Sequence, residues 1–86
     1  MRYRVLLRPA AQKLLRKLRD KTLAARLVDS MRELAENPRP VGSEKLSGLD
    51  EFHRIRIGDY RILYQIQDDA LLVLVVKMGH RRDICR

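Results

Sequence analysis

Hydrophobic positions follow two different periods in the first half of this chain. Residues 3–8 alternate, which predicts a short strand with three apolar side chains on one face, Tyr3, Val5 and Leu7. Pro9 suits the first turn of a helix, and residues 10–21 continue that helix with leucines at helical spacing, Leu14, Leu15 and Leu18. A second helix is predicted over about 22–36, with an apolar stripe that we expect in the core, Leu23, Leu27, Met31 and Leu34.

The second half of the chain returns to strand-like alternation. The motif ENPRPVG ends the second helix through its prolines and glycine, and residues 43–51 are predicted to form a loop with a Ser-Gly turn. Three strands follow, over 52–58, 60–66 and 71–78, with connections so short that neighbours must be antiparallel. The third, LLVLVVKM, is apolar on both faces, which is typical of a central strand. Residues 80–86 could add a last short strand.

This order of elements predicts an α+β fold in a single domain, residues 1–86. An N-terminal strand precedes a helical hairpin, which covers one face of a mostly antiparallel strand meander. The hydrophobic content of 45% is typical of a globular chain. One cysteine excludes an internal disulfide and favours a reducing compartment. Without a signal-like segment or a run near the roughly 20 apolar residues of a membrane span, we expect a cytoplasmic protein with no membrane partner.

Alternation along the first two meander strands gathers arginines on one face. The core face takes the apolar residues Ile55, Ile57, Ile62, Tyr64 and Ile66. The opposite face takes Arg54, Arg56 and Arg61, and like charges on paired strands repel unless an anion lies between them. Guanidinium forks match phosphate oxygens, so the pattern indicates a phosphate site. An edge hairpin that carries solvated charges against aggregation gives the same pattern.

These residue types suit the cleavage of RNA. When a 2′-hydroxyl attacks its own phosphate, fixed guanidiniums stabilise the charge that builds on the phosphorane oxygens. Protons must also move, and arginine is a poor base because its pKa exceeds about 12. His80, which follows the last strand with Arg81 and Arg82, is a candidate by pKa, although a lone histidine can equally be structural. No metal motif is visible, and no cofactor is expected.

The charge balance points to an acidic partner. Nineteen Lys and Arg against eleven Asp and Glu give a net charge of +8, which suits nucleic acid, a ribonucleoprotein surface or an acidic protein. The first predicted helix carries a basic ridge, Lys13, Arg16, Lys17 and Lys21. This ridge either binds RNA or an acidic protein, or is a solvated helix surface.

Taken in order, these motifs resemble a known family. The stretch EKLSGLDEFHRIRIGDYRILYQIQDDALLVLVVKMGHRRDICR, with the helical hairpin and the NPRP break before it, resembles the RelE branch of the RelE/ParE toxin superfamily. The specific parts are KL-G-L, R-R-GDYRI-Y-I-DD and a strand ending in GHRR, and the likeness spans nearly the whole chain. It implies a mostly antiparallel sheet with two helices on one side.

The resemblance also implies a toxin of a type II toxin–antitoxin pair. RelE-like members enter the ribosomal A site and cut the bound mRNA without a metal, leaving a 2′,3′-cyclic phosphate, and a RelB-like antitoxin wraps and blocks them. Carried over by position, Arg54 and Arg56 match the family's basic pair on the second strand, Arg61 matches the arginine after the turn, and Arg81 matches the arginine after the fourth strand. The resemblance implies a catalytic role for these four arginines. We expect five further basic residues to bind RNA or the ribosome, Lys13, Arg16, Lys17, Lys45 and Arg82.

Two positions depart from the family pattern. Ser47 stands where a basic residue is frequent, and Cys85 stands where the family usually has a tyrosine that transfers protons or stacks on the substrate base. A thiol cannot stack, but nearby arginines would lower its pKa, so Cys85 is a further candidate for proton transfer. Two alternatives therefore stay open. One is a ParE-like toxin that inhibits DNA gyrase by binding, and the other is a relic that binds RNA or antitoxin without cutting.

Overall fold

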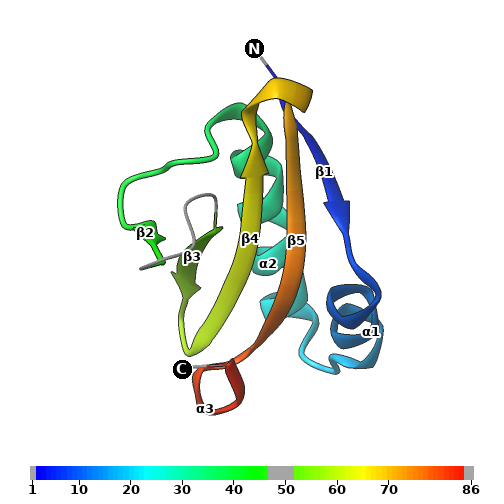
Figure 1. Cartoon of the computed structure of the whole chain (residues 1–86). Coiled ribbons are helices and arrows are strands. Elements are labelled where there is room, and N and C mark those ends of the chain that lie inside the picture. Colours follow the sequence, from blue (N-terminus) through cyan, green and yellow to red (C-terminus); the bar gives the residue numbers. More distant parts are fainter. Residues whose placement is uncertain (1, 47–51, 85–86) are drawn as a thin grey trace.

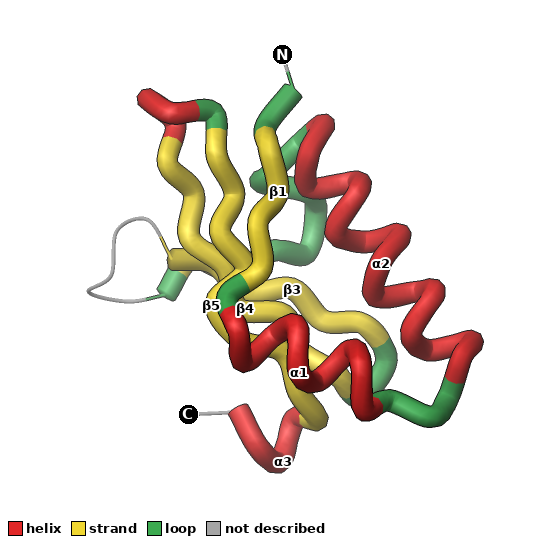
Figure 2. The backbone as a smooth tube through the Cα atoms, turned by 90° about the vertical axis from the view of Figure 1, so that its right-hand side faces the viewer, coloured by secondary structure: helices red, strands yellow, loops and turns green. Residues whose placement is uncertain are grey.

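A twisted sheet with helices on one face makes up the chain. The structure is a computed structural model that describes residues 2–46 and 52–84, with the backbone alone for residues 83 and 84. Within these residues the sheet has five strands in the order β1-β5-β4-β3-β2 (Figure 1). Figure 2 shows α1 and α2 on one side of this sheet, which leaves the opposite face open. The predicted α+β fold with a helical hairpin on one face is confirmed.

The two helices are α1 (Pro9–Lys17) and α2 (Lys21–Glu36). The first ends earlier than predicted because Leu18 is extended, and the Asp20 side chain accepts a hydrogen bond of 3.0 Å from the Leu23 N–H, which starts α2. The predicted stripe of α2 is confirmed, since Leu27, Met31 and Leu34 are buried and Leu23 packs against them. Neither of these helices, nor the short turn of helix near the C-terminus of the described chain, is long and apolar enough to cross a membrane.

The strands bring distant parts of the chain together. They are β1 (Arg4–Leu7), β2 (Glu44–Lys45), β3 (Phe52–Ile57), β4 (Tyr60–Gln67) and β5 (Leu72–His80). The meander β3-β4-β5 is antiparallel as predicted, and the apolar β5 is an interior strand. The pattern did not predict the place of β1, which pairs parallel with β5. Long crossovers permit parallel neighbours, and the whole chain between β1 and β5 serves as that crossover.

Two segments, residues 43–51 and 80–86, have a different structure from the one that the sequence predicted. The stretch 43–51, expected as a loop, contains β2, which pairs antiparallel with β3; its Ser-Gly turn lies outside the described residues. The short strand that residues 80–86 could have added does not form within the described residues, because β5 already includes His80 and Arg81–Ile84 form the short helix α3. The Arg81 N–H donates a hydrogen bond of 2.7 Å to the Asp59 carbonyl oxygen, which fixes the start of this turn.

A β-bulge in β5 decides which side chains face the core near the end of that strand. Tyr64 pairs with Val75, but Leu63 pairs with Lys77, so Val76 is the extra residue. The buried positions of β5 accordingly change from Val73 and Val75 to Met78. The bulge therefore turns even-numbered residues toward the helices beyond this point and odd-numbered residues toward the open face.

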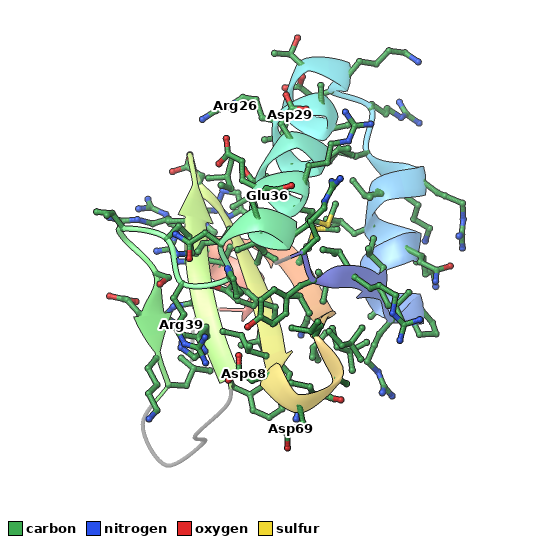
Figure 3. The ribbon with its side chains drawn as sticks, turned by 90° about the horizontal axis from the view of Figure 1, so that it is seen from above. Arg26, Asp29, Glu36, Arg39, Asp68 and Asp69 are labelled. Atoms are coloured by element: carbon green, nitrogen blue, oxygen red, sulfur yellow. The ribbon has the colours of Figure 1, made fainter. Side chains whose placement is uncertain are left out.

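The loop between α2 and β2 is tied to the sheet by two contacts. Tyr64 is fully buried, and its hydroxyl donates a hydrogen bond of 2.7 Å to the Pro38 carbonyl oxygen. Arg39 forms a forked ion pair with Asp68, which directly follows β4 (Figure 3). The Tyr3 hydroxyl donates a hydrogen bond to the same carboxylate. These contacts fix the segment that leads into β2.

Candidate functional site

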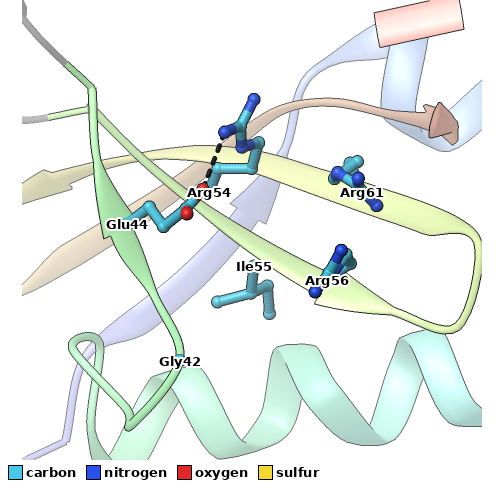
Figure 4. Close-up of a pocket in the computed structure, with 6 residues that line it drawn as sticks. All are labelled: Gly42, Glu44, Arg54, Ile55, Arg56 and Arg61. Atoms are coloured by element: carbon cyan, nitrogen blue, oxygen red, sulfur yellow. Dashed lines mark hydrogen bonds and ion pairs between the residues drawn. The ribbon is translucent and has the colours of Figure 1, made fainter. Parts of the chain in front are cut away.

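Three arginines of the open face line one pocket at the β2 side of the sheet. Arg54 and Arg56 come from β3 and Arg61 from β4, and the pocket of about 240 Å³ is completed by Gly42, Glu44 and Ile55 (Figure 4). The strand period explains the arrangement, since alternate residues of β3 share a face and Arg61 pairs with Arg56 in register. The arginine cluster predicted from alternation alone is therefore present. We call this pocket the arginine pocket.

Arg61 is the member of the cluster that contains a buried guanidinium nitrogen without a partner in the described part of the chain. Its Cα lies opposite Arg56 on β3 and opposite Gly79 on β5, and Gly79 adds no side chain to the open face. Its Nη1 atom is buried and has no hydrogen-bond partner within the described part of the chain. A buried donor without a partner is rare because it costs the full desolvation of the group. An acceptor brought by a ligand would satisfy this nitrogen.

Arg54 differs from its two neighbours because it already has an anionic partner. Its Nη2 donates a hydrogen bond of 2.7 Å to Oε1 of Glu44, which lies opposite it on β2. This hydrogen bond and the charge of Arg54 hold the pKa of the Glu44 carboxyl below its usual value, and the charges of Arg56 and Arg61 add to the effect. Glu44 is therefore ionised at neutral pH and projects into the cationic pocket.

His80, Arg81 and Arg82 do not join the arginine pocket. Because of the bulge in β5, His80 pairs with Tyr60 on the helix-covered side, where the two rings meet edge to face with centroids 5.7 Å apart. The structure therefore does not bring His80, the candidate for proton transfer, to the arginine face. Arg81 and Arg82 are exposed on α3 and are not among the residues that line the pocket.

The other predicted residues lie apart from this pocket or outside the described chain. Lys45 neighbours Glu44 on β2 but pairs with the buried His53, so alternation places it on the opposite side of the sheet. The basic ridge, Lys13, Arg16 and Lys17 with Lys21 beyond the end of α1, is exposed in the helical layer. Cys85 and Ser47 both fall outside the described residues.

Glu44 is the pocket residue that sequence reasoning missed. It stands in a stretch that reads as a loop, and its approach to Arg54 depends on the pairing of β2 with β3. The sequence signal that could have found it is weak. Glu44 and Lys45 precede the first arginine strand, and two such residues can form a short edge strand with their side chains on opposite faces. Residues 2–46 and 52–84 contain no group of three or more His, Cys, Asp or Glu that could hold a metal ion.

Comparison with known proteins assigns this chain to a family. Residues 5–85 match the family model described as the ParE toxin of the type II toxin–antitoxin system parDE. Toxin RelG of Mycobacterium tuberculosis is 34% identical over 86 residues, which cover 100% of this chain and 99% of that protein. This chain belongs to the RelE/ParE toxin superfamily. It is a RelE-like toxin of a toxin–antitoxin system, and the predicted resemblance is confirmed.

Two further relatives place the RelE-like toxin within that superfamily. The mRNA interferase toxin RelE of Escherichia coli K12 is 31% identical over 62 residues, which cover 70% of this chain and 64% of that protein. The archaeal RelE–RelB complex of Pyrococcus horikoshii contains a chain with a TM-score of 0.83 and 28% identity, with 94% of the RelE-like toxin and 97% of that chain covered. The sheet, the helical hairpin and their order are thus those of RelE structures.

Proposed function

We propose that this RelE-like toxin is a ribosome-dependent mRNA endonuclease. The observation that carries the proposal is the buried Nη1 of Arg61, which has no partner among residues 2–46 and 52–84. Arg61 lies opposite Arg56 in a pocket lined by three arginines. An RNA phosphodiester supplies the anionic acceptor that this nitrogen lacks. The family's RelE member from Escherichia coli is named an mRNA interferase, which supports the same chemistry for this chain.

The proposed reaction is an attack of the 2′-hydroxyl on the adjacent phosphate. The 2′-oxygen bonds to phosphorus, the 5′-oxygen leaves, and the products are a 2′,3′-cyclic phosphate and a 5′-hydroxyl. Negative charge grows on the two non-bridging oxygens, where preorganised donors lower the barrier most. Arg56 and Arg61 supply that stabilisation, and three guanidiniums provide the positive charge without a metal or other cofactor.

The proposed substrate is mRNA in the ribosomal A site. The net charge of +8 favours association with a ribonucleoprotein surface. The basic ridge on α1 and the exposed Arg81 and Arg82 on α3 lie outside the arginine pocket, where they would contact ribosomal RNA rather than the scissile phosphate. In this proposal they bind, and the arginine pocket cuts.

We propose a RelB-like antitoxin as the protein partner. The RelE chain of Pyrococcus horikoshii, which shares this fold, was solved in complex with RelB. The excess of basic residues favours an antitoxin with an acidic surface. Co-purification of the product of the neighbouring gene at moderate salt tests this partner, and a neighbouring product that stays unbound contradicts it.

Primer-extension mapping on programmed ribosomes tests the cleavage directly. Cuts are expected only when ribosomes are present, with 2′,3′-cyclic phosphate ends, and none at a site carrying a single 2′-deoxynucleotide. Arg61→Ala should lose the cuts even at saturating toxin, whereas Arg81→Ala should weaken them only below saturation. Cys85→Ala tests whether the thiol takes part. Intact mRNA with active translation contradicts the proposal.

Inhibition of DNA gyrase is the second candidate, because the matching family model is named for ParE. A supercoiling assay run beside the ribosome assay separates the two. Inhibited supercoiling with intact mRNA would favour gyrase, whereas cleaved mRNA with unaffected supercoiling favours the endonuclease. A protein inhibitor has no evident need for a guanidinium nitrogen that is buried and, among the described residues, unpartnered on a face lined with arginines. The endonuclease is therefore the function that the pocket supports best.

A further inference from the structure

The guanidiniums of the arginine pocket can stabilise negative charge on the phosphate. The proposed reaction also needs a group that accepts the proton of the 2′-hydroxyl. A guanidinium cannot act as a base at neutral pH, because its pKa is above about 12. His80 turns to the opposite side of the sheet, where it packs against Tyr60. Among the described residues that line the pocket, Glu44 alone carries an ionisable group that can accept a proton.

The carboxylate of Glu44 is well placed for that task. One oxygen, Oε1, is held by Arg54 Nη2 at 2.7 Å, which fixes the orientation of the group on the open face. The other oxygen, Oε2, has no hydrogen-bond partner among the residues that the structure describes. The side chain is 65% exposed, so a substrate hydroxyl can approach it from solvent. Figure 4 shows the carboxylate on the same side of β3 as the three guanidiniums.

We propose that Glu44 is the general base of the cleavage reaction, an inference that rests on the endonuclease function. Oε2 takes the proton of the attacking 2′-hydroxyl while the 2′-oxygen bonds to phosphorus. The bond from phosphorus to the 5′-oxygen breaks, the leaving oxygen takes the electron pair, and solvent water protonates it. Glu44 then returns its proton to the solvent, so the enzyme ends the cycle unchanged.

The electrostatics of the pocket suit a base that strengthens when substrate arrives. In the free protein the arginines keep the pKa of the Glu44 carboxyl low, so the group is deprotonated and ready. A phosphodiester bound between Arg56 and Arg61 neutralises part of their charge and places a negative charge near the carboxylate. Both changes raise the pKa of Glu44 and make it a better proton acceptor in the complex.

A second role for Glu44 gives different results in the same assays. If the carboxylate only orients Arg54 and offsets its charge, it acts before the reaction and takes no proton. Glu44→Gln keeps the shape of the side chain and an oxygen that can still accept from Arg54, but it removes the basic group. This variant therefore separates a base from a counter-ion.

The matched control is Glu36→Gln. Glu36 also forms an exposed ion pair with an arginine, with 3.0 Å between Oε2 and Arg2 Nε, and its side chain is 63% exposed. It lies at the end of α2, away from the arginine pocket. The control thus removes the same charge and the same kind of contact without touching the pocket.

The experiment measures single-turnover cleavage on programmed ribosomes at saturating toxin, together with affinity for the ribosomes. Glu44→Gln is expected to lower the cleavage rate by about 10²–10⁴ with affinity equal to or above that of the wild type. The acidic limb of the wild-type pH–rate profile should disappear in this variant, and formate should partly restore the rate of Glu44→Ala. Glu36→Gln should cut like the wild type.

Three outcomes overturn the inference. Cleavage by Glu44→Gln near the wild-type rate, with the acidic limb intact, leaves Glu44 as a counter-ion. A loss of affinity equal to the loss of rate makes it a residue that positions Arg54. If the wild type itself does not cleave mRNA, the proposed endonuclease function is wrong, and the proposed role of Glu44 fails with it. The first two results contradict only the role of Glu44.

Discussion

Arg56 and Arg61 lie directly opposite each other on β3 and β4, so two guanidiniums of like charge share one rung of the sheet. Such a pair destabilises a sheet when nothing anionic lies between its members. The fold tolerates it beside a pocket in which a buried nitrogen of Arg61 has no partner from the described chain. Function and stability therefore make opposite demands on these two positions.

Removal of either arginine should separate activity from stability. We expect Arg56→Ala and Arg61→Ala to lower single-turnover cleavage by about 10²–10³, the effect of deleting one preorganised donor. The free energy of unfolding in urea should stay unchanged or rise, because a like-charge contact disappears. Arg32→Ala is the control, since Arg32 is 79% exposed on α2 and its ion pair with Asp29 spans 3.9 Å. Parallel losses of activity and stability would instead indicate a structural role.

The buried hydroxyl of Tyr64 should contribute measurably to stability. Tyr64→Phe removes its hydrogen bond to the Pro38 carbonyl oxygen and leaves that oxygen without this donor. We expect a loss of about 1–3 kcal/mol in the free energy of unfolding, measured by urea titration. Tyr3→Phe is the matched control, because it also removes a hydroxyl hydrogen bond of 2.7 Å but at an exposed site. Equal losses in the two variants would contradict the expected effect of burial.

Alkaline pH should unfold the protein partly through the same residue. Burial raises the pKa of Tyr64 from its usual value of 10.0 to about 12. Between these two pH values the unfolded chain releases the phenolic proton while the folded chain keeps it, so stability falls as pH rises. The unfolding midpoint of the wild type should therefore decrease from pH 10 to pH 12 more steeply than that of Tyr64→Phe. Identical slopes would show that Tyr64 titrates normally.

His80 should contribute packing rather than proton transfer. Its ring meets the Tyr60 ring edge to face on the helix-covered side of the sheet, an arrangement that stabilises proteins by about 0.5–1.5 kcal/mol. His80→Ala is expected to lower stability by a similar amount and to keep cleavage close to the wild-type rate. If the cleavage rate of the wild type changes with pH near neutrality and that of His80→Ala does not, His80 takes part in proton transfer.

The basic ridge should govern binding and its salt dependence. Replacing Lys13, Arg16 and Lys17 together with Gln removes three exposed charges from α1. We expect weaker association with ribosomes and a shallower dependence of affinity on salt, because fewer counterions are released on binding. The cleavage rate at saturating toxin should not change. An unchanged salt dependence would make the ridge a solvated surface.

Local patterns in the sequence predicted the arginine face because the strand period of two operates over a few residues. Arg54, Arg56 and Arg61 stand at alternate positions of two short strands, and the tight turn between them fixes their register. The stripe of α2 was readable for a similar reason, since helical spacing repeats along one element. Both features depend on neighbours close in sequence.

The features that the sequence did not predict depend on contacts between distant segments. The bulge at Val76 inserts one residue into β5, and this single insertion decides that His80 turns away from the arginines. Glu44 reaches Arg54 only because a two-residue strand pairs with β3. Neither event leaves a periodic signal, because each is settled by the partner strand.

The parallel pairing of β1 with β5 delays completion of the sheet while the toxin is being synthesised. Arg4 pairs with Leu72, and at the rate of about 5–20 residues per second the ribosome needs several seconds to add the residues between them. Until then β1 has no β5 to pair with, and β4 has no β5 beside it. The five-stranded sheet that carries the arginine pocket therefore cannot be completed on a nascent chain until β5 has been synthesised.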